Sequence, residues 1–259
     1  MKRMVHILGN KINCFNSIDE LYEYLISNLT KDIPNKYVTV NNVHTVIEGY
    51  RDKTFQSIIN NGFLSLPDGK PLEFVGRLKG VGSIKRLFGP SIMEAIIDKG
   101  RSDKISHFFL GSSAETLEKL KRSIEIQYPG TIIVGMISPP FLPFDKWKNE
   151  NYIDIINLHK PDFIWIGLGA PRQERWMSQF CTQINRGFIF GIGAGFDYLA
   201  GNTKHAPVWM KESSLEWLFR LCQEPRRLYK RYFNIIPPFL FFASLEILKE
   251  RFKSFKKFH

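Results

Sequence analysis

The sequence has few cysteines and none of the motifs that mark metal, phosphate-loop or nucleophile chemistry. The three cysteines are widely spaced, which matches no zinc pattern and fits thiols kept in a reducing compartment: Cys14, Cys181 and Cys222. The chain contains no P-loop, nucleophile elbow, kinase motif or Asp-x-Asp pair. The histidines show no metal-ligand spacing either, and we expect each to be packed or solvated: His44, His107, His159 and His205. The basic N-terminal stretch lacks an apolar core of signal-peptide length, so we expect it to form a first strand of a cytoplasmic protein.

Acidic residues are outnumbered, and the excess positive charge is concentrated near the C-terminus. The formal net charge is +11, and residues 220–259 carry ten Lys/Arg against three acids, a net +7. Such a block attracts polyanions, which include nucleic acid, nucleotide phosphates and anionic lipid. The 44% hydrophobic and 24% charged content is that of an ordinary folded protein, so the 259 residues are enough for a sizeable core.

Apolar runs alternate with helical patterns over most of the chain. This alternation predicts an α/β fold, with a mostly parallel, Rossmann-like sheet that has helices on both faces. The predicted strands are 37–43, 63–69, 105–110, 131–136, 163–168 and 188–192. The predicted helices are 19–29, a segment from about 44 to 60, 91–99, 113–127, 152–159 and 171–180. The Gly-rich basic segment 76–89 is expected to be a loop.

The character of the sequence changes after residue 205. We therefore expect an α/β catalytic core over 1–205 and a helical, basic, membrane-associating appendage over 206–259. Residues 206–221 form a Trp-rich helical stretch. The apolar segment 233–248 contains two prolines and a glutamate, and we interpret it as too short and too interrupted to span a membrane. The final KERFKSFKKF alternates cations with Phe, which is typical of a segment that lies in a membrane interface.

Polar residues and glycines follow several predicted strands where those strands end. In FLSLPDG, Asp68 stands on a strand-to-loop corner between Pro67 and Gly69. Further polar residues and glycines at strand ends are Thr39, Asn41, Gly167, Gly169, Gln173, Gly193, Gly195 and Asp197. Each also has a local explanation, as a turn residue, a strand-end polar or a first-turn helix residue. In a parallel sheet, however, all of them meet at the carboxyl edge, where ligands bind.

The string GIGAGF at 191–196 is only a partial dinucleotide-binding pattern. Phe196 occupies the position of the third glycine, and no suitably placed acid follows. We interpret these glycines as allowing a ligand, such as a nucleotide phosphate, to approach the backbone closely.

Seven strings together carry a resemblance to a known family. They are VTVNN (38–42), LPDG (66–69), FFLG (108–111), GLGAPRQERW (167–176), GAGFDYLAG (193–201), APVWM (206–210) and LEWLFRLCQEPRR (215–227). In this order they resemble the WecG/TagA/CpsF family of bacterial glycosyltransferases, over nearly the whole chain to about Tyr232. The resemblance implies an inverting transferase that needs neither a metal nor a cofactor. It also implies a UDP-sugar donor, typically N-acetylmannosamine or its uronic acid, and a polyprenyl-diphosphate-linked GlcNAc acceptor at the cytoplasmic membrane face.

The resemblance also assigns roles to the residues singled out above. It implies that Asp68 is the general base, and we expect Thr39 and Gln173, from their shared position at strand ends, to be further catalytic residues. The expected substrate-binding set is Asn41, Gly169, Gly193, Asp197, Arg220, Arg227 and Arg231, in which the arginine forks suit the phosphate oxygens of the leaving UDP. The sequence departs from the family pattern at His205, where arginine is common, and at Lys70-Pro71, where a small or apolar residue is more usual.

Two other classes of function remain open from the residues alone. A basic tail interleaved with aromatics is compatible with a nucleic-acid-binding protein, although the long apolar runs suit lipid better than a phosphate backbone. A nicotinamide-dependent oxidoreductase is the third class, and the broken glycine pattern weakens it. The expected partners are therefore a UDP-sugar, the lipid-linked acceptor and an anionic membrane surface at the inner face of the cell membrane, without nucleic acid. The sequence leaves a homo-oligomer open.

Overall fold

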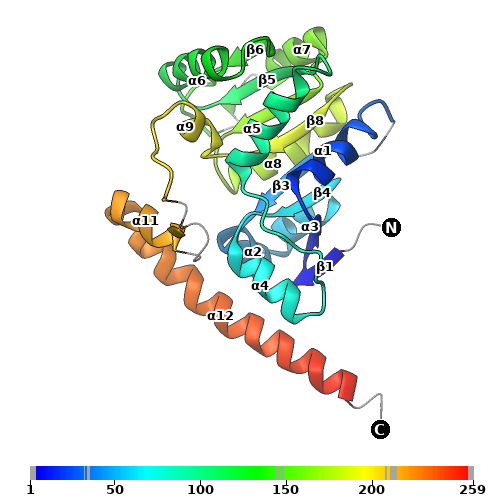
Figure 1. The fold of residues 1–259 in the computed structure, drawn as a ribbon, viewed down its shortest axis with the longest axis vertical. Coiled ribbons are helices and arrows are strands. Elements are labelled where there is room, and N and C mark those ends of the chain that lie inside the picture. Colours follow the sequence, from blue (N-terminus) through cyan, green and yellow to red (C-terminus); the bar gives the residue numbers. More distant parts are fainter. Residues whose placement is uncertain are drawn as a thin grey trace.

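The fold is built on a six-stranded sheet in which all strands are parallel, as the sequence predicts (Figure 1). The computed structural model describes residues 4–31, 33, 36–143, 146–147, 149–207, 209–210 and 215–255. The strand order is β4-β3-β8-β7-β5-β6. The strands are β3 (Tyr37–Asn41), β4 (Leu64–Pro67), β5 (Ser106–Gly111), β6 (Ile132–Ile137), β7 (Phe163–Gly167) and β8 (Phe188–Gly191).

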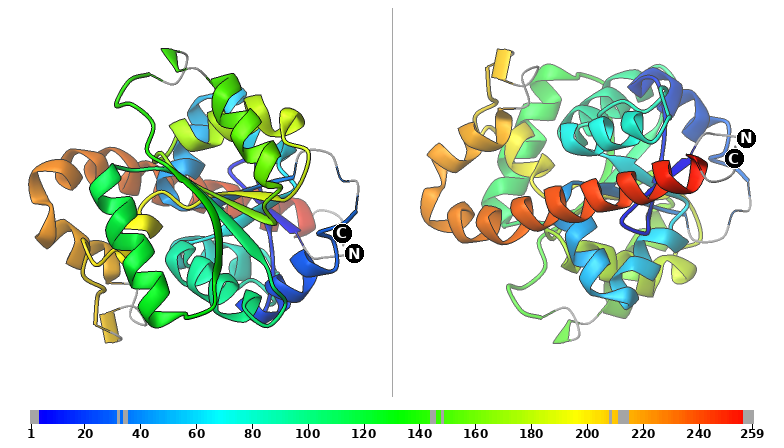
Figure 2. Two further views of the ribbon diagram at one scale, coloured as in Figure 1. Left: turned by 90° about the horizontal axis from the view of Figure 1, so that it is seen from above. Right: turned by 90° about the horizontal axis from the view of Figure 1, so that it is seen from below.

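Helices cover both faces of the sheet (Figure 2, left). One face packs against α1 (Ile18–Ile26), α5 (Gly89–Gly100), α6 (Ala114–Gln127) and α9 (Gly195–Leu199). The other face packs against α3 (Lys53–Asn61), α7 (Asn149–His159) and α8 (Arg172–Phe180). Because both faces are covered, the central strands are continuous apolar runs rather than alternating ones. Phe163 and Trp165 face one helical layer, and Ile164 and Ile166 face the other.

The N-terminal segment forms a hairpin outside the main sheet. Strands β1 (Met4–Ile7) and β2 (Asn10–Asn13) pair antiparallel. Together with α2 (Val43–Arg51), α4 (Lys70–Leu78) and α12 (Pro225–Phe255), they surround a separate apolar cluster. The predicted first strand therefore exists, but it is part of this second packing unit.

Two predicted helical boundaries were wrong because polar side chains cap helices there. The segment expected as one helix to about residue 60 is split at Asp52, whose carboxylate accepts hydrogen bonds from the N–H groups of Thr54 (2.9 Å) and Phe55 (3.2 Å). Strand β3 ends at Asn41, two residues earlier than predicted, because Asn42 caps α2. The predicted loop 76–89 also begins too early, since α4 continues to Leu78.

The predicted helical C-terminal appendage is present, but its last helix is longer and less interrupted than expected. Of the stretch 206–221, the structure describes helix α11 only from Glu216 (Glu216–Gln223), and residues 208 and 211–214 lie outside the described residues. The segment predicted to be interrupted by two prolines is one continuous 31-residue helix, α12, with Pro237 and Pro238 inside it. Residues 228–252 are long and apolar enough to cross a membrane by length and composition, with only 17% of the most apolar window buried in the fold.

Helix α12 crosses the molecule below α2 and α4 (Figures 1 and 2, right). Its inward face places Ile235, Phe239 and Ala243 in the apolar cluster of the hairpin. Its later turns are held by Lys79, whose Nζ lies 3.2 Å from Glu246 Oε2 and 2.8 Å from Glu250 Oε1. Packing along this face fixes a helix that the two prolines alone would weaken.

Candidate active site

The carboxyl ends of β3 and β4 bring together three of the polar side chains in this site. The strand register places Thr39 beside Ser65 and Asn41 beside Pro67. The Asn41 Nδ2 group donates to Thr39 Oγ1 (2.9 Å) and to Ser65 Oγ (2.7 Å), and all three side chains are buried. Asn41 Oδ1 has no hydrogen-bond partner within the described residues. A buried acceptor of this kind is available to a ligand N–H or O–H.

Asp68 follows directly on this group. Its N–H donates to the Asn41 carbonyl at 2.7 Å, so the corner is fixed to β3. Its carboxylate Oδ1 accepts a hydrogen bond from the Gly89 N–H at 3.3 Å, at the start of α5. Burial raises the pKa of Asp68 from 3.8 to about 6, with nearby Glu216 acting in the same direction and Arg86 and Arg220 opposing it. The residue keeps part of its surface accessible, so a substrate hydroxyl can reach a carboxyl group that is still ionised near neutral pH.

Arg86 connects Asp68 to the C-terminal helices. Its Nε donates to the Asp68 carbonyl at 2.6 Å, and its Nη2 lies 2.5 Å from Glu216 Oε2 on α11. The guanidinium also stacks over the Phe88 ring, 4.6 Å from its centroid. One side chain therefore holds the loop before α5, the strand corner and α11 together.

Arg220 approaches the same place from α11. Its guanidinium lies 5.9 Å from the centroid of the Tyr198 ring, and its Nε has no hydrogen-bond partner in the described part of the chain. Tyr198, on α9, is buried, and its hydroxyl is likewise unpartnered within the residues that the structure describes. A partly buried guanidinium whose Nε lacks a partner among the described residues, beside Asp68, is suited to an anionic ligand group.

The other two predicted arginines come from α12. Arg231 Nη2 lies 2.8 Å from His44 Nδ1, in the first turn of α2. Burial, helped by Arg231, lowers the pKa of His44 to about 4, so the imidazole stays neutral and accepts this hydrogen bond. The backbone of Arg227 lies in α12, and its side chain is outside what the structure describes.

The ends of β7 and β8 form a second, mostly uncharged part of the carboxyl edge. Gln173 is buried in the first turn of α8, and its Nε2 donates to Glu174 Oε1 at 2.9 Å. A Cβ at Gly191 would lie 3.0 Å from Gln173 Nε2, and one at Gly193 (φ +53°) would lie 3.2 Å from Gln173 Oε1. Gly191 is the register partner of Thr39, so the Gln173 amide lies over the strand next to Thr39. Gly169 (φ +75°) accepts from the Gln173 N–H at 3.0 Å.

Asp197 is engaged differently from the other predicted residues. Its carbonyl accepts from the N–H groups of Asn202 (2.9 Å) and Thr203 (3.1 Å), and its carboxylate accepts from Asn202 Nδ2 at 3.4 Å. Asn202 also donates to Thr116 on α6. These contacts organise the turn after α9, whereas the next residue, Tyr198, is the one beside Arg220.

Sequence reasoning missed five residues of this site: Ser65, Arg86, Glu174, Tyr198 and Glu216. Burial raises the pKa of the Glu174 carboxyl from 4.5 to about 7, and its Oε2 has no partner among the described residues. Glu174, Tyr198 and Glu216 stand inside the quoted strings GLGAPRQERW, GAGFDYLAG and LEWLFRLCQEPRR, so a signal for them was present. The described residues contain no group of three or more His, Cys, Asp or Glu placed to hold a metal ion.

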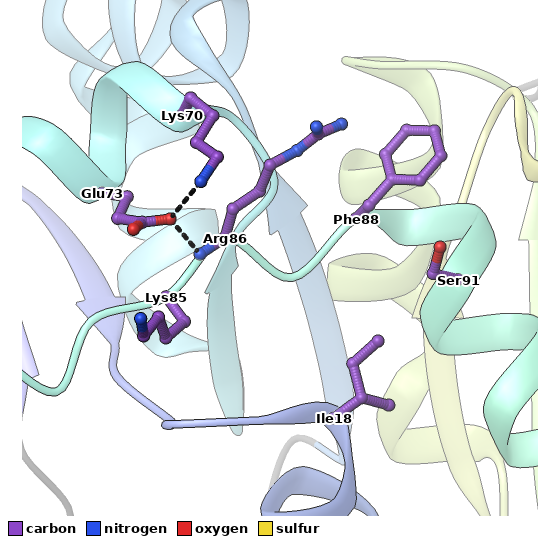
Figure 3. A pocket seen from close by; sticks show the side chains of 7 residues that line it. All are labelled: Ile18, Lys70, Glu73, Lys85, Arg86, Phe88 and Ser91. Carbon is purple, nitrogen blue, oxygen red and sulfur yellow. Dashed lines mark hydrogen bonds and ion pairs between the residues drawn. The ribbon is translucent and has the colours of Figure 1, made fainter. Parts of the chain in front are cut away.

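A cavity of about 310 Å³ is drawn in Figure 3. It lies near the Asp68 corner, because its lining residue Arg86 donates to the Asp68 carbonyl. Its lining residues come from the start of α1, from α4, from the segment before α5 and from α5 itself: Ile18, Lys70, Glu73, Lys85, Arg86, Phe88 and Ser91. Glu73 accepts a hydrogen bond from the Arg86 N–H at 2.8 Å and lies 3.5 Å from Lys70 Nζ.

Known proteins match the chain over most of its length. A relative from Bacillus spizizenii is 28% identical over 203 residues, which cover 77% of this chain and 75% of the relative. A Bacillus subtilis protein is 25% identical over 244 residues, 94% of this chain and 91% of the relative, and a Staphylococcus aureus protein is 23% identical over 212 residues, 80% and 79%. All three are named N-acetylglucosaminyldiphosphoundecaprenol N-acetyl-beta-D-mannosaminyltransferase. The model of the glycosyl transferase WecG/TagA/CpsF family matches residues 5–254, so the chain belongs to this family of glycosyltransferases.

Proposed function

We propose that this enzyme transfers N-acetylmannosamine from a UDP-activated donor to GlcNAc that is linked through diphosphate to a polyprenol. Family membership decides for glycosyl transfer among the three classes that the residues left open. The sugar and the acceptor are those named for the relatives. The observation that carries the proposal is the Asp68 carboxyl, which lies at the carboxyl edge of the sheet beside the partly buried Arg220, whose Nε is unpartnered among the described residues.

In the proposed reaction the acceptor hydroxyl attacks the anomeric carbon of the donor. Asp68 removes the hydroxyl proton as the new glycosidic bond forms. The bond between the anomeric carbon and the UDP oxygen breaks on the opposite face, so the configuration inverts. The electron pair leaves with UDP, whose diphosphate gains negative charge that Arg220 and Arg231 offset without a metal ion.

The remaining residues hold the two substrates. Asn41 Oδ1 and Gln173 Oε1 are buried acceptors without protein partners among the described residues, and we assign them to substrate N–H or hydroxyl groups. Thr39 orients the Asn41 amide, and Gly169 and Gly193 leave room for a ligand near Gln173.

Asp197→Ala is expected to raise the KM for the donor. A lower melting temperature with unchanged donor KM would make Asp197 a purely structural residue.

We also propose that α12 lies on the inner face of the cell membrane, in the plane of the surface. Its outward face exposes large apolar side chains, listed along the helix as Tyr229, Phe233, Leu240, Phe241, Leu245, Leu248 and Phe252. Its inward face is packed on the protein through Ile235, Phe239 and Ala243. A helix held to the fold along one side cannot also be surrounded by lipid, so we favour interfacial binding over a membrane span.

Turnover with a panel of UDP-sugars and a short-chain GlcNAc-diphosphate acceptor, followed by UDP release, tests the proposed reaction. We expect UDP-N-acetylmannosamine to be used best, with activity unchanged by EDTA. UDP release from none of the sugars, or activity that disappears in EDTA and returns with Mg²⁺, would contradict the proposal.

A further inference from the structure

The cavity beside Asp68 has no role in the reaction as described so far. Three of its seven lining side chains are cationic and one is acidic: Lys70, Lys85 and Arg86 against Glu73. The single acid is already neutralised, because Glu73 accepts from the Arg86 N–H and is paired with Arg77 at 2.6 Å and with Lys70 at 3.5 Å. Arg86 is itself paired with Glu216, so the positive charge that the cavity presents comes from Lys70 and Lys85.

The arrangement of the residues that line the cavity supports binding of a small anionic group. In Figure 3, Lys70, Glu73 and Lys85 lie on one side, Phe88 and Ser91 lie on the opposite side, and Ile18 lies below. Residues from the first turns of α1, α4 and α5 line the cavity, and the positive end of α5, which has no acid in its first turn, adds to the charge of the lysines. Lys70 is only about one-third exposed, so its ammonium group is partly withdrawn from water.

The cavity shares a wall with the proposed base. The segment that contributes Arg86 and Phe88 to the lining also contacts the strand corner, because Leu87 N–H donates to the Pro67 carbonyl at 2.6 Å and Gly89 N–H donates to Asp68 Oδ1. Lys70 follows Asp68 by two residues. A ligand anchored in the cavity is thus within reach of Asp68.

An exposed apolar ridge leads away from the cavity along α4. Lys70, Phe74 and Leu78 are spaced four residues apart and share one helix face. Phe74 is 63% exposed and Leu78 is 40% exposed, although both are large apolar side chains. At the far end of α4, Lys79 pairs with Glu246 and Glu250 of α12. The ridge therefore runs from the cationic cavity to the helix that we place at the membrane.

From this arrangement we propose that the cavity binds the diphosphate of the lipid-linked acceptor, with Lys70 and Lys85 as its ligands. The identity of the acceptor rests on the proposed function. The Phe74–Leu78 ridge carries the first part of the polyprenyl chain toward the membrane, and the sugar extends from the cavity to Asp68. The diphosphate of the UDP-sugar donor is the alternative ligand for the same cationic cavity. The experiment distinguishes binding of the acceptor from binding of the donor.

The test compares Lys70→Ala/Lys85→Ala with Lys119→Ala/Lys121→Ala, a matched pair of exposed lysines on α6. Two acceptors are used: GlcNAc diphosphate with a short alkyl chain, and an alkyl GlcNAc glycoside without the diphosphate. We expect the cavity variant to raise the KM for the diphosphate acceptor by about 10-fold, the low end of what losing charge-assisted hydrogen bonds costs. The KM for the UDP-sugar, the rate with the neutral glycoside and all parameters of the α6 control are expected to stay within about twofold. An unchanged acceptor KM would overturn the proposal, and a raised donor KM alone would assign the cavity to UDP.

Direct binding separates this inference from the proposed reaction. Calorimetry uses the diphosphate acceptor without a donor, so no turnover takes place. We expect binding to the parent and about 10-fold weaker binding to the cavity variant. If the parent binds this acceptor but transfers no sugar to it, the reaction is wrong and the anion site stands. If sugar is transferred but both proteins bind alike, only the cavity proposal fails. Phe74→Ser/Leu78→Ser is expected to raise the KM for a long-chain prenyl acceptor but not for the short-chain one, and equal effects on both would remove the ridge from the proposal.

Discussion

The two halves of the carboxyl edge of the sheet differ in chemistry although they are built in the same way. The β3/β4 half gathers ionised groups around one carboxylate, with Asp68, Arg86, Glu216 and Arg220 in mutual electrostatic contact. The β7/β8 half offers amides and glycines around Gln173, and the neighbouring acid Glu174 is buried with its pKa raised to about 7. A parallel sheet brings its loops to one edge, but the residue after each strand decides what that edge does. We infer that proton and phosphate chemistry belong to the first half, and sugar positioning to the second.

Removing the charge from the β3/β4 half is expected to have the largest effect. Asp68→Asn should fold normally and lose about 10²- to 10⁴-fold in turnover, because it cannot accept the acceptor proton. Steady-state UDP release measures the loss, and Asp154→Asn, an exposed acid on α7, is the matched control. Turnover within about threefold of the parent would remove Asp68 from the role of base.

Removing the amide from the β7/β8 half tests whether that half acts by positioning. Gln173→Leu keeps the volume but loses the free Oε1 acceptor, and we expect kcat/KM to fall by about 10- to 100-fold, the cost of leaving a substrate donor unpaired. The pH dependence of the remaining activity should match that of the parent. A shifted pH profile would show that the two halves are coupled, which would contradict the separation proposed here.

The pH dependence of activity in the parent enzyme directly reports the ionisation of Asp68 in the β3/β4 half of the edge. Burial raises the pKa of Asp68 to about 6, so the carboxylate form that accepts a proton predominates only above that pH. We expect kcat/KM to fall about tenfold per pH unit below this value and to level off above it. A profile that remains flat down to pH 4.5, measured with the protein still folded by circular dichroism, would be inconsistent with Asp68 as the base.

The outward face of α12 is expected to control membrane binding without touching the sheet edge. Phe241→Glu/Leu248→Glu changes two exposed side chains, 60% and 51% accessible, and leaves the inward face intact. Co-sedimentation with anionic vesicles should weaken by about 5- to 10-fold, while turnover on a soluble acceptor stays near the parent value. The exposed pair Ile126→Glu/Ile132→Glu, on α6 and β6, serves as a control for added negative charge. Equal losses in both variants would mean that charge alone, and not the α12 face, is responsible.

The smallest expected effect concerns the stability of the folded protein and the burial of Glu174 in the β7/β8 half of the carboxyl edge. The folded protein binds a proton at Glu174 more tightly than the unfolded chain, because its pKa rises from 4.5 to about 7 on burial. Stability is therefore lost as the pH rises from 4.5 through 7, and Glu174→Gln, which cannot ionise, should melt about 3–8 °C above the parent at pH 8. The gain should be much smaller at pH 5, and Glu125→Gln on the surface of α6 should show none. An equal gain at both pH values would indicate that ionisation is not the cause.

The sheet and part of the site could be predicted because their signals are local. Each central strand is an apolar run bounded by turn residues, and parallel pairing then places Thr39, Asn41, Asp68 and Gln173 at one edge. The Arg86–Glu216 pair could not be predicted, because the two residues are 130 positions apart and no sequence pattern at either one indicates the other as its partner. The helical character of the C-terminal segment was predicted, but the unbroken length of α12 was not. The two prolines are strong local signals against a continuous helix, whereas its stability comes from packing on a distant hairpin. Long-range contacts, which one sequence does not record, account for most of what was missed.

The contact between the N-terminal hairpin and α12 has a consequence for synthesis. The Leu8 N–H donates to Glu246 Oε2 at 3.0 Å, across 238 positions of the chain. The hairpin therefore leaves the ribosome long before the helix that covers its apolar side has been made. Closing so large a loop is slow compared with forming the local βα units, so the sheet should assemble first and the hairpin cluster last. Until then the nascent chain exposes two apolar surfaces, one on the hairpin and one on the unfinished helix, and a chaperone or the membrane has that interval in which to bind them.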